Sequence, residues 1–591
     1  MLQKFTETAR PEQGPPRLAA LRAQFNAARI DGVIVPRTDA HQGEYVAPRD
    51  DRLAWLTGFT GSAGYCVALR DAAGVFVDGR YRVQVKSQVA DVFTPVDWPE
   101  TGLAAWISDK LPDGGVVGID PWLFSVDQMR SLRADLTGVS LRFTENLVDR
   151  IWQDQPAPPM GTVFAQDVAL AGEPHGDKID RLARDLGASS CVITLPDSIA
   201  WLLNIRGSDI AHNPVPHGFA LLNADGTVEL FMADEKLADL GDHLGDRVSV
   251  LPPEGFLAAI ATLQGPVRID PATCPVAVAD ALQGVEIVEA PDPCLLPKAC
   301  KNEAELAGAR AAHLRDGAAM VRFLAWLDAQ PAGSYTEIDV VERLEAERRA
   351  TNALRDISFE TISGAGSNGA IVHYRVTERT NRQVNAGELL LVDSGGQYVD
   401  GTTDITRTIA IGQPGDEERE AFTRVLKGMI ALSRLRFPAG LAGRDIDVLA
   451  RAALWEVGLD YGHGTGHGVG AYLSVHEGPA RIARTGTVPF APGMILSNEP
   501  GFYREGAYGI RIENLIAVEH ASPVAGQTVP AMYRFETLTW VPIDRRLIVP
   551  DLLTAQERDW LNAYHGDVLA RIGDLVDGSV AGWLHAACAP L

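Results

Sequence analysis

The chain contains few cysteines, and none stands where a disulfide framework or a cysteine-ligated metal site would need it. The six cysteines among the 591 residues are Cys66, Cys191, Cys274, Cys294, Cys300 and Cys588. No C-x-x-C pair occurs among them, whereas small secreted domains carry dense and regularly spaced cysteines. The pattern therefore favours a reduced intracellular protein, and we expect a cytoplasmic location.

Long apolar runs and clustered positive charge are also missing. No window approaches the roughly 18 apolar residues that a membrane-spanning helix needs, and residues 1–11 contain no apolar stretch of signal-peptide length. The formal net charge is −24, and no lysine- or arginine-rich run occurs. Since binding to nucleic-acid phosphates requires clustered positive charge, we expect neither a membrane nor a nucleic acid as a partner.

Length and an internal repeat indicate several domains. At 591 residues the chain is too long for one hydrophobic core and should form roughly three or four domains. Residues 51–62 align without a gap on residues 197–208, and six of the twelve positions are identical. The strand-like segments that flank the copies match in order: 31–36, 65–69 and 74–78 for the first, and 191–196, 218–222 and 228–232 for the second. Chance similarity between two tryptophan-containing turns does not explain these flanks, so we expect two copies of one α/β domain.

A proline-rich linker, residues 290–297, separates these copies from a third region. Asn302 followed by Glu305 is typical of a helix N-terminus and predicts a long helix that ends near residue 327. Further helices are expected after residues 334–337, over 415–433, over 444–457 and after 554–557. Strand-like segments lie between them, which favours an α+β domain. The expected domains are residues 1–155, 156–297 and 298–591.

Five residues in the last third of the chain could together hold two divalent metal ions. They are Asp393, Asp404, His467, Glu499 and Glu513. Four carboxylates and one imidazole supply four negative charges, which balance two divalent cations. Oxygen-rich sites with one histidine suit Mn²⁺, with Zn²⁺ as a substitute. Two ions about 3.5–4 Å apart can activate one water molecule for hydrolysis.

The strands that we expect around the two aspartates support their assignment as metal ligands. Asp393 ends the apolar run 389–392, residues 394–396 are expected to form a turn, and Asp404 opens the returning strand 404–411. An aspartate after an apolar run is often only a turn former. A hairpin would bring both carboxylates together, however, and close carboxylates repel each other unless a cation lies between them.

The glycine-dense segment 462–470 carries His463 and His467. Glycine at every second position makes a helix unfavourable and lets the backbone bring an imidazole close to a ligand. His373 and His476 belong to the same region, and neutral imidazoles near this site could bind substrate and move protons.

Two further features leave alternatives open. Arg511 shares the expected strand face of Glu513, so it forms either a plain ion pair with Glu513 or a contact that steadies a metal-bound carboxylate. Residues 364–369 match G-x-G-x-x-G, but the following residues, 370–375, read as a strand and not as a phosphate-binding helix. We therefore do not expect a dinucleotide site there.

In this order, the motifs resemble the pita-bread metallopeptidases, a family that includes methionine aminopeptidase, prolidase and aminopeptidase P. The resemblance covers nearly the whole chain, and the doubled N-terminal domain is most similar to the three-domain cytosolic aminopeptidase P (Xaa-Pro aminopeptidase) group. The motifs that carry it are residues 53–62, 77–81, 301–306, 315–319, 463–470, 497–503, 535–539 and 542–544. It implies an α+β chain in which two creatinase-N-like α/β domains precede a pita-bread catalytic domain with a C-terminal helical extension.

The resemblance also implies roles for the metal ligands. Asp404 and Glu513 would bridge two divalent ions, usually manganese. Asp393 would hold one ion, and His467 and Glu499 the other. A metal-bridging hydroxide would attack the peptide carbonyl and release the first residue of peptides with proline in second position.

Further roles follow from the same resemblance. His373 and His476 would contact the substrate backbone and stabilise the tetrahedral centre, and His463 would shape the proline pocket. With Arg511 these three are the candidate catalytic residues. The resemblance also implies a homodimer.

Two alternatives compete with this function. A prolidase restricted to dipeptides would share the metal site, so the sequence leaves that alternative open. A non-enzymatic binding module or a metal-free relative such as creatinase would have lost metal ligands. All five candidate ligands are present, which argues against that second class.

Overall fold

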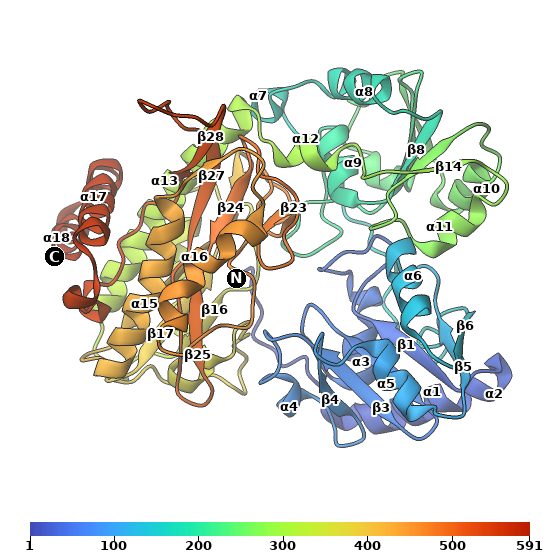
Figure 1. Cartoon of the computed structure of the whole chain (residues 1–591), viewed down its shortest axis with the longest axis horizontal. Helices are drawn as coiled ribbons and strands as arrows, with labels where there is room; N and C mark the ends of the chain where they lie inside the picture. The colour runs from blue at the N-terminus through green and yellow to red at the C-terminus, as the bar shows by residue number, and fades with distance from the viewer. The chain divides into compact units, whose positions relative to one another are not determined.

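The computed structural model describes residues 1–591 and divides into two compact units (Figure 1). One unit contains Thr8–Val168 and Glu173–Leu295. The other contains Leu296–Leu591 together with the short segments Met1–Glu7 and Ala169–Gly172.

Two six-stranded sheets with the same strand order form the first unit. The first has the order β4-β3-β2-β1-β5-β6, and the second has the order β12-β11-β10-β8-β13-β14. The strands of the first are β1 (Gly32–Pro36), β2 (Tyr65–Leu69), β3 (Ala73–Val77), β4 (Thr94–Asp97), β5 (Gly115–Ile119) and β6 (Val139–Phe143). Those of the second are β8 (Ser190–Ile193), β10 (Phe219–Asn223), β11 (Val228–Phe231), β12 (Val248–Leu251), β13 (Val267–Ile269) and β14 (Ile287–Glu289).

Pairing directions also agree between the two sheets. In the first sheet β1 pairs antiparallel with β2 and parallel with β5, and in the second β8 pairs antiparallel with β10 and parallel with β13. Both outer pairs at the sheet edges are parallel. The prediction of two copies of one α/β domain is therefore confirmed.

Helices cover these sheets in both copies (Figure 1). The first copy contains α1 (Gly14–Ala23), α2 (Phe25–Ala28), α3 (Arg52–Thr57), α4 (Val85–Gln88), α5 (Leu103–Lys110) and α6 (Val126–Asp135). The second contains α8 (His175–Arg184), α9 (Pro196–Leu202), α10 (Phe256–Ile260) and α11 (Val276–Ala281). The short strands β7 (Phe164–Ala165) and β9 (Ile205–Arg206) pair with each other, and the short helices α7 (Val168–Ala171) and α12 (Leu295–Ala299) lie where the chain passes from one unit to the other.

The repeated twelve residues form the helices α3 and α9 and the turns after them. The aligned tryptophans, Trp55 and Trp201, each have a cation over the ring at 4.2 Å, Arg17 in the first copy and Lys178 in the second. Such contacts stabilise a buried ring and a charge together. The repeat therefore preserves a packing unit of helix, tryptophan and cation.

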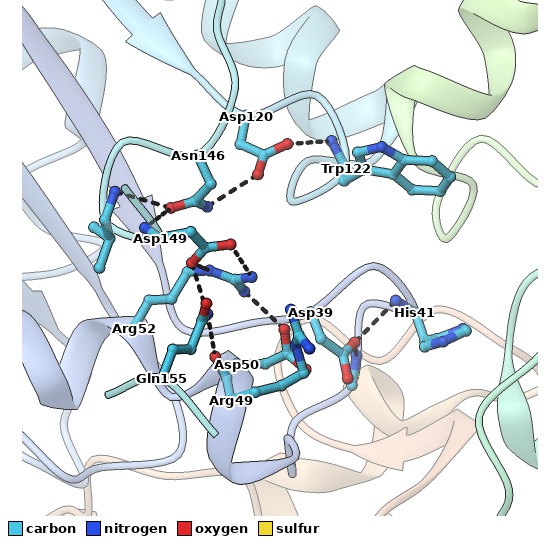
Figure 2. Close-up of polar contacts among 12 residues, drawn as sticks. Asp39, His41, Arg49, Asp50, Arg52, Asp120, Trp122, Asn146, Asp149 and Gln155 are labelled. Carbon is cyan, nitrogen blue, oxygen red and sulfur yellow. Dashed lines mark hydrogen bonds and ion pairs between the residues drawn. The ribbon is translucent and has the colours of Figure 1, made fainter. Parts of the chain in front are cut away.

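In the first copy the start of α3 is tied to the chain after β6 (Figure 2). The Arg52 guanidinium donates to Asp50 at 2.9 Å and to both carboxylate oxygens of Asp149 at 2.7 and 2.9 Å. Asn146, three residues before Asp149, donates to Asp120 at 2.9 Å. Because Arg52 is only 6% exposed, its two carboxylates supply the charge that makes its burial possible.

The second unit combines several small sheets with long helices. A six-stranded sheet has the order β21-β28-β27-β24-β22-β23, and a three-stranded sheet has the order β16-β17-β20. Their strands are β21 (Arg436–Pro438), β28 (Met532–Thr537), β27 (Asn514–His520), β24 (Ile495–Asn498), β22 (Gly466–Gly468), β23 (Glu477–Ile482), β16 (Ile362–Ala365), β17 (Leu389–Ser394) and β20 (Ile405–Ala410). Smaller sheets contain β15 (Asp356–Ile357), β18 (Gly396–Tyr398), β19 (Gly401–Thr402), β25 (Gly501–Arg504) and β26 (Tyr508–Arg511).

Six helices of this unit are long enough to cover its sheets, and three of them begin at capping residues that the sequence predicts. They are α13 (Glu303–Asp328), α14 (Glu337–Arg349), α15 (Asp416–Ser433), α16 (Gly443–Trp455), α17 (Ala555–Ile572) and α18 (Gly578–Ala587). The side chains of Asn302, Thr336 and Thr554 form capping boxes at the starts of α13, α14 and α17. Mixed helices and antiparallel strands confirm the predicted α+β class.

Two local predictions are wrong. Residues 394–396 do not form a simple turn: β17 runs through Ser394, and the chain then forms the hairpin β18–β19, whose first strand pairs with β15, before it returns in β20. Residues 370–375 are not a strand either, because a 3-10 helix, Gly366–Ala370, follows β16 and irregular structure follows it. At the first place β18 pairs with the distant strand β15. At the second, the N–H groups of Ile371 and Tyr374 donate to carbonyls three residues earlier, which forms turns and not a strand.

None of the helices combines the length and apolar character that spanning a membrane requires. All six cysteines carry free thiols.

A buried triad of charges joins α12 to the start of β23. Lys298 Nζ lies 2.7 Å from Glu477 Oε1, and Lys301 Nζ contacts Glu477 Oε2. The three side chains are at most 3% exposed. Burial alone would raise the pKa of Glu477, but the two ammonium charges overcome this effect and hold the pKa below its usual range.

We expect Glu477→Ala to lower the free energy of unfolding by about 3–5 kcal/mol, because it leaves two buried ammonium groups without a counter-ion. Urea denaturation followed by tryptophan fluorescence measures this loss. Because the pKa of Glu477 is lowered in the folded chain, the stabilisation exists above the unfolded-state pKa of about 4.3 and is lost as the pH falls through the folded-state pKa.

The matched control is Glu536→Ala, which breaks a more exposed pair with Arg310, whose side chain is 41% exposed. Exposed pairs contribute less than about 1 kcal/mol. Equal losses in the two variants would contradict a special role for the buried triad.

Candidate metal centre and active site

The five candidate metal ligands come from strands of two sheets that meet in the second unit. Asp393 lies on β17, and Asp404 immediately precedes β20, its antiparallel partner. His467 lies on β22, Glu499 follows β24, and Glu513 precedes β27, three neighbouring strands of the larger sheet. The Glu513 N–H donates to the carbonyl of Thr406 on β20 at 3.1 Å, which links the two sheets at the site.

Ligand atoms from both sheets converge. One ligand atom from each of Asp404, His467 and Glu513 lies within 4.8 Å of the others. His467 Nε2 lies 3.5 Å from Asp404 Oδ2 and 3.3 Å from Glu499 Oε1. Asp393 joins the group through its charge and a hydrogen bond that act on Asp404. All five predicted ligands therefore lie in one cluster.

The cluster is strained electrostatically as a set of protein groups alone. Burial, followed by the charges of Asp393 and Glu499, raises the pKa of Asp404 well above its usual range. Burial and then the charges of Asp404, Glu499 and Asp393 do the same to Glu513. Burial also raises the pKa of Glu499, although the charge of His467 opposes it. Buried carboxylates at such separations need a cation to be ionised together.

Unsatisfied oxygen atoms point to the same need. Asp393 Oδ1, Asp404 Oδ1 and Glu513 Oε1 are buried and have no hydrogen-bond partner. The three residues are 7%, 4% and 1% exposed. Leaving a buried acceptor unpaired is costly, and carboxylate oxygens with one imidazole are donors that hard divalent cations accept. The residues present therefore fit divalent metal ions.

The orientation of His467 suits a metal ligand. Its Nδ1 lies 2.9 Å from the carbonyl oxygen of Gly468, and a carbonyl can only accept a hydrogen bond. The proton must therefore sit on Nδ1, which leaves the lone pair of Nε2 facing the carboxylates. The Ser497 hydroxyl links His467 to Glu499: it accepts from the His467 N–H at 2.9 Å and donates to Glu499 Oε1 at 3.1 Å.

Arg511 contacts Asp393 and not Glu513. Its Nη2 lies 2.6 Å from Asp393 Oδ2, and its Nε donates to Thr406 Oγ1 at 3.1 Å. Thr406 in turn donates to Glu513 Oε2 at 2.8 Å. The plain ion pair with Glu513 that we considered is thus not formed, and the guanidinium instead steadies one carboxylate directly and another through Thr406.

The glycines around His467 are required for space. A Cβ at Gly466 would lie 2.0 Å from the carbonyl oxygen of Ser497, and a Cβ at Gly468 would lie 2.2 Å from that of Glu477. No side chain fits at such distances. Residues 466–468 form the short strand β22 between β23 and β24, so the glycines let three strands approach closely around the imidazole.

Each remaining candidate histidine lies at the edge of this cluster. The ring centroids of His476 and His467 are 4.3 Å apart. His463 Nε2 lies 3.0 Å from the Tyr503 hydroxyl, which accepts from Arg511 Nη1 at 2.6 Å. His373 follows Val372, whose carbonyl accepts from the same Nη1 at 3.4 Å. All three imidazoles are half-buried.

Sequence reasoning assigned no role to Tyr503, Thr406 or Ser497. Each touches a predicted site residue through a hydroxyl group. Tyr503 lies two residues past the Glu499-Pro500-Gly501 motif. Thr406 lies two residues after Asp404, so on a strand the two side chains point to the same face. Proximity to predicted ligands was the available signal, but hydroxyl residues are too common in strands for it to single them out.

Comparison with known proteins agrees with this architecture. The metallopeptidase family M24 model matches residues 307–520, and a model of the C-terminal region of this family matches residues 531–591. Two models of the creatinase/prolidase N-terminal domain match residues 17–151 and 154–305. The chain belongs to metallopeptidase family M24, with two creatinase-N-like domains before its pita-bread domain.

Relatives align over almost the whole chain. Aminopeptidase P2 of Arabidopsis thaliana is 39% identical over 627 residues, which cover 97% of this chain and 88% of the plant protein. A probable Xaa-Pro aminopeptidase P of Laccaria bicolor is 39% identical over 604 residues, which cover 97% of this chain and 93% of the fungal protein.

A solved structure is similar over the same extent. The X-prolyl aminopeptidase of Caenorhabditis elegans, described as a cytosolic enzyme with a di-nuclear active site, superposes with a TM-score of 0.93 at 34% identity. The match covers 98% of this chain and 100% of the nematode chain.

We expect divalent ions to stabilise the protein, because they neutralise clustered carboxylates. With free Mn²⁺ a hundredfold above its dissociation constant, the gain is about 2.7 kcal/mol, or roughly 5–10 °C in the unfolding midpoint. Glu513→Gln should abolish this gain and leave the metal-free protein no less stable, since it removes one repelling charge.

Thermal denaturation with chelator and with added Mn²⁺ measures both effects, and metal analysis counts the bound ions. Glu519→Gln, which changes a half-buried glutamate on β27 that pairs with Arg534 outside the cluster, is the matched control. An unchanged metal response in Glu513→Gln would show that Glu513 is not a ligand.

Proposed function

We propose that the chain is a metalloaminopeptidase that hydrolyses the N-terminal Xaa-Pro bond of peptides. The observation that carries the proposal is the cluster of four carboxylates and His467, three of whose buried oxygens lack partners. It lies in a chain that matches the nematode X-prolyl aminopeptidase over 98% of its length.

Two divalent ions would occupy the cluster, and manganese is the proposed metal. Asp404 and Glu513 would bridge the ions, Asp393 would hold one, and His467 with Glu499 the other. Oxygen donors with a single imidazole favour Mn²⁺ and accept Zn²⁺. When bound, the ions supply a nucleophile from water near neutral pH and polarise the peptide carbonyl.

Protein groups at the edge of the cluster would bind the substrate. His476, in ring contact with His467, and His373 would donate hydrogen bonds to the substrate backbone and stabilise negative charge on the carbonyl oxygen. His463 and Tyr503 pack with their rings 5.4 Å apart and offer a wall for the proline ring. Arg511 would keep Asp393 and Tyr503 in place, since it contacts both.

Peptides that begin Arg-Pro-Pro should be cleaved after the first residue, and replacing the second residue by alanine should lower kcat/KM by roughly 10- to 200-fold. Loss of a few methylene groups from an apolar pocket has an effect of this size. Product analysis by mass spectrometry, with a peptide acetylated at its amino group as control, tests the need for a free N-terminus.

Prolidase activity is the alternative, and dipeptides decide between the two. If Xaa-Pro dipeptides are hydrolysed and Arg-Pro-Pro peptides are not, the chain is a dipeptidase. If peptides with proline and with alanine in second position are cleaved at equal rates, the proposal of a proline pocket is wrong.

We propose a cytoplasmic homodimer whose interface includes the exposed face of α16. On this helix Val448, Leu449 and Trp455 are 43%, 36% and 41% exposed, and Val457, two residues past its end, is 44% exposed. Val448 and Trp455 are seven residues apart and so lie on one side of the helix. Several large apolar side chains exposed close together in the sequence are the composition expected of an interaction surface.

Val448→Asp should convert the dimer to a monomer, because it places a charge within an apolar interface. Light scattering after size-exclusion chromatography measures the mass. Val524→Asp, at a valine that is 55% exposed outside α16, is the control. A wild-type monomer, or a Val448→Asp dimer, would contradict this interface.

A further inference from the structure

Glu337 is a buried carboxylate of this unit that lies outside the metal cluster. Glu337 is the first residue of α14 and is fully buried, at 0% exposure. Burial raises its pKa to about 7, although three hydrogen-bond donors and the charge of Arg382 oppose this shift. Burying a carboxyl group is unfavourable unless hydrogen bonds compensate it.

The donors to the Glu337 carboxylate all come from one short segment, residues 365–374. Its Oε1 accepts from the Ala365 N–H at 2.8 Å, and both oxygens accept from Asn368 Nδ2 at 3.0 Å. The Tyr374 hydroxyl donates to Oε2 at 3.0 Å. Glu337 therefore ties together the beginning, middle and end of residues 365–374, and His373 immediately precedes the last contact.

Asn368 and Tyr374 also contact each other. Asn368 Nδ2 donates to the Tyr374 hydroxyl at 2.9 Å, and Thr380 provides further oxygen atoms at 3.0 and 3.3 Å from that hydroxyl. Tyr374 is only 4% exposed. The residue next to His373 is thus anchored by a connected polar network, and not by apolar packing alone.

The opposite side of the segment is held against the metal cluster. Arg511 donates to the Val372 carbonyl at 3.4 Å and to Asp393 at 2.6 Å. A Cβ at Gly509 on β26 would lie 1.8 Å from the carbonyl oxygen of Gly369, so backbone meets backbone there. Residues 365–374 are therefore clamped between α14 and β26.

We propose that Glu337, Asn368 and Tyr374 are positioning residues that set the imidazole of His373 against the substrate. The proposal rests on the proposed function, in which His373 contacts the substrate. The side chains of the three make their hydrogen bonds to one another, to Ala365 and to Thr380, and not to a predicted metal ligand. Each therefore acts through the backbone that carries His373. The G-x-G-x-x-G match at 364–369 belongs to this clamp: a Cβ at Gly364 would lie 2.8 Å from Gly369.

A double-mutant cycle on the Mn²⁺-loaded full chain tests the proposal. Tyr374→Phe removes one hydroxyl and should lower kcat for an Arg-Pro-Pro peptide by about 10- to 100-fold, as small misplacements of catalytic groups do, with KM within about twofold. His373→Ala should lower kcat at least as much. In the double variant the loss should equal that of His373→Ala alone, because Tyr374 acts through His373.

The control is Tyr508→Phe, which removes another tyrosine–glutamate hydrogen bond, 2.8 Å long to Glu417, from the neighbouring strand β26. Its kcat should stay within about twofold of wild type. Multiplied losses in the double variant, or an unchanged kcat in Tyr374→Phe, would overturn the proposal. Glu337→Gln, which keeps the shape of the side chain, should reproduce the Tyr374→Phe loss if it folds.

A second measurement does not depend on activity. In Zn²⁺-loaded protein with ¹³C-labelled histidine, the NMR signal that disappears in His373→Ala reports the surroundings of that ring. It should shift in Tyr374→Phe and stay in place in Tyr508→Phe. An unmoved signal would overturn the positioning role, whereas a shifted signal without peptide cleavage would uphold it and reject the proposed function.

Discussion

Mutual repulsion among the buried carboxylates is the constraint on which the second unit depends. Asp393, Asp404 and Glu513 are each less than a tenth exposed, and burial, together with the charges of neighbouring carboxylates, raises the pKa values of Asp404, Glu513 and Glu499. Among the protein groups, Arg511 and His467 offset this repulsion only in part. The surrounding strands must therefore hold the group together against its own repulsion, and a divalent cation supplies the remaining attraction.

Several features of the fold follow from this constraint. β17 and β20 are joined along six residue pairs, so Asp393 and Asp404 cannot move apart without breaking the ladder. Gly466 and Gly468 allow three strands to meet at His467 with no room for a Cβ. The Arg511 guanidinium donates hydrogen bonds to both Asp393 and the Tyr503 hydroxyl. Rigid backbone around the ligands keeps the site arranged before any ion binds, which lowers the cost of metal binding.

Much of this could be predicted, and the failures have physical causes. A short apolar run revealed β17, an alternating pattern revealed β20, and capping residues revealed α13, α14 and α17, because those signals are local. The hairpin β18–β19 escaped prediction because its strands have three and two residues and depend on pairing with β15. The partner of Arg511 escaped because Asp393 lies 118 residues away, and no local pattern reports such a contact.

The internal repeat shows the same difference between local and distant information. Only twelve residues align visibly, yet the two sheets agree strand by strand. What survives in the sequence is the helix with its tryptophan and the following turn, where a cation covers the ring in each copy. The anchors have diverged: Arg52 binds Asp149 in the first copy, whereas the uncharged Ser198 stands at the aligned position in the second. In both copies an aspartate lies in the segment after the last strand, but Asp149 accepts from a guanidinium, whereas Asp292 accepts from the backbone N–H of Cys294 at 2.8 Å. The strand order is therefore preserved although the side chain that anchors this segment in the first copy has no charged counterpart in the second, so a topology can outlast the residues that stabilise it.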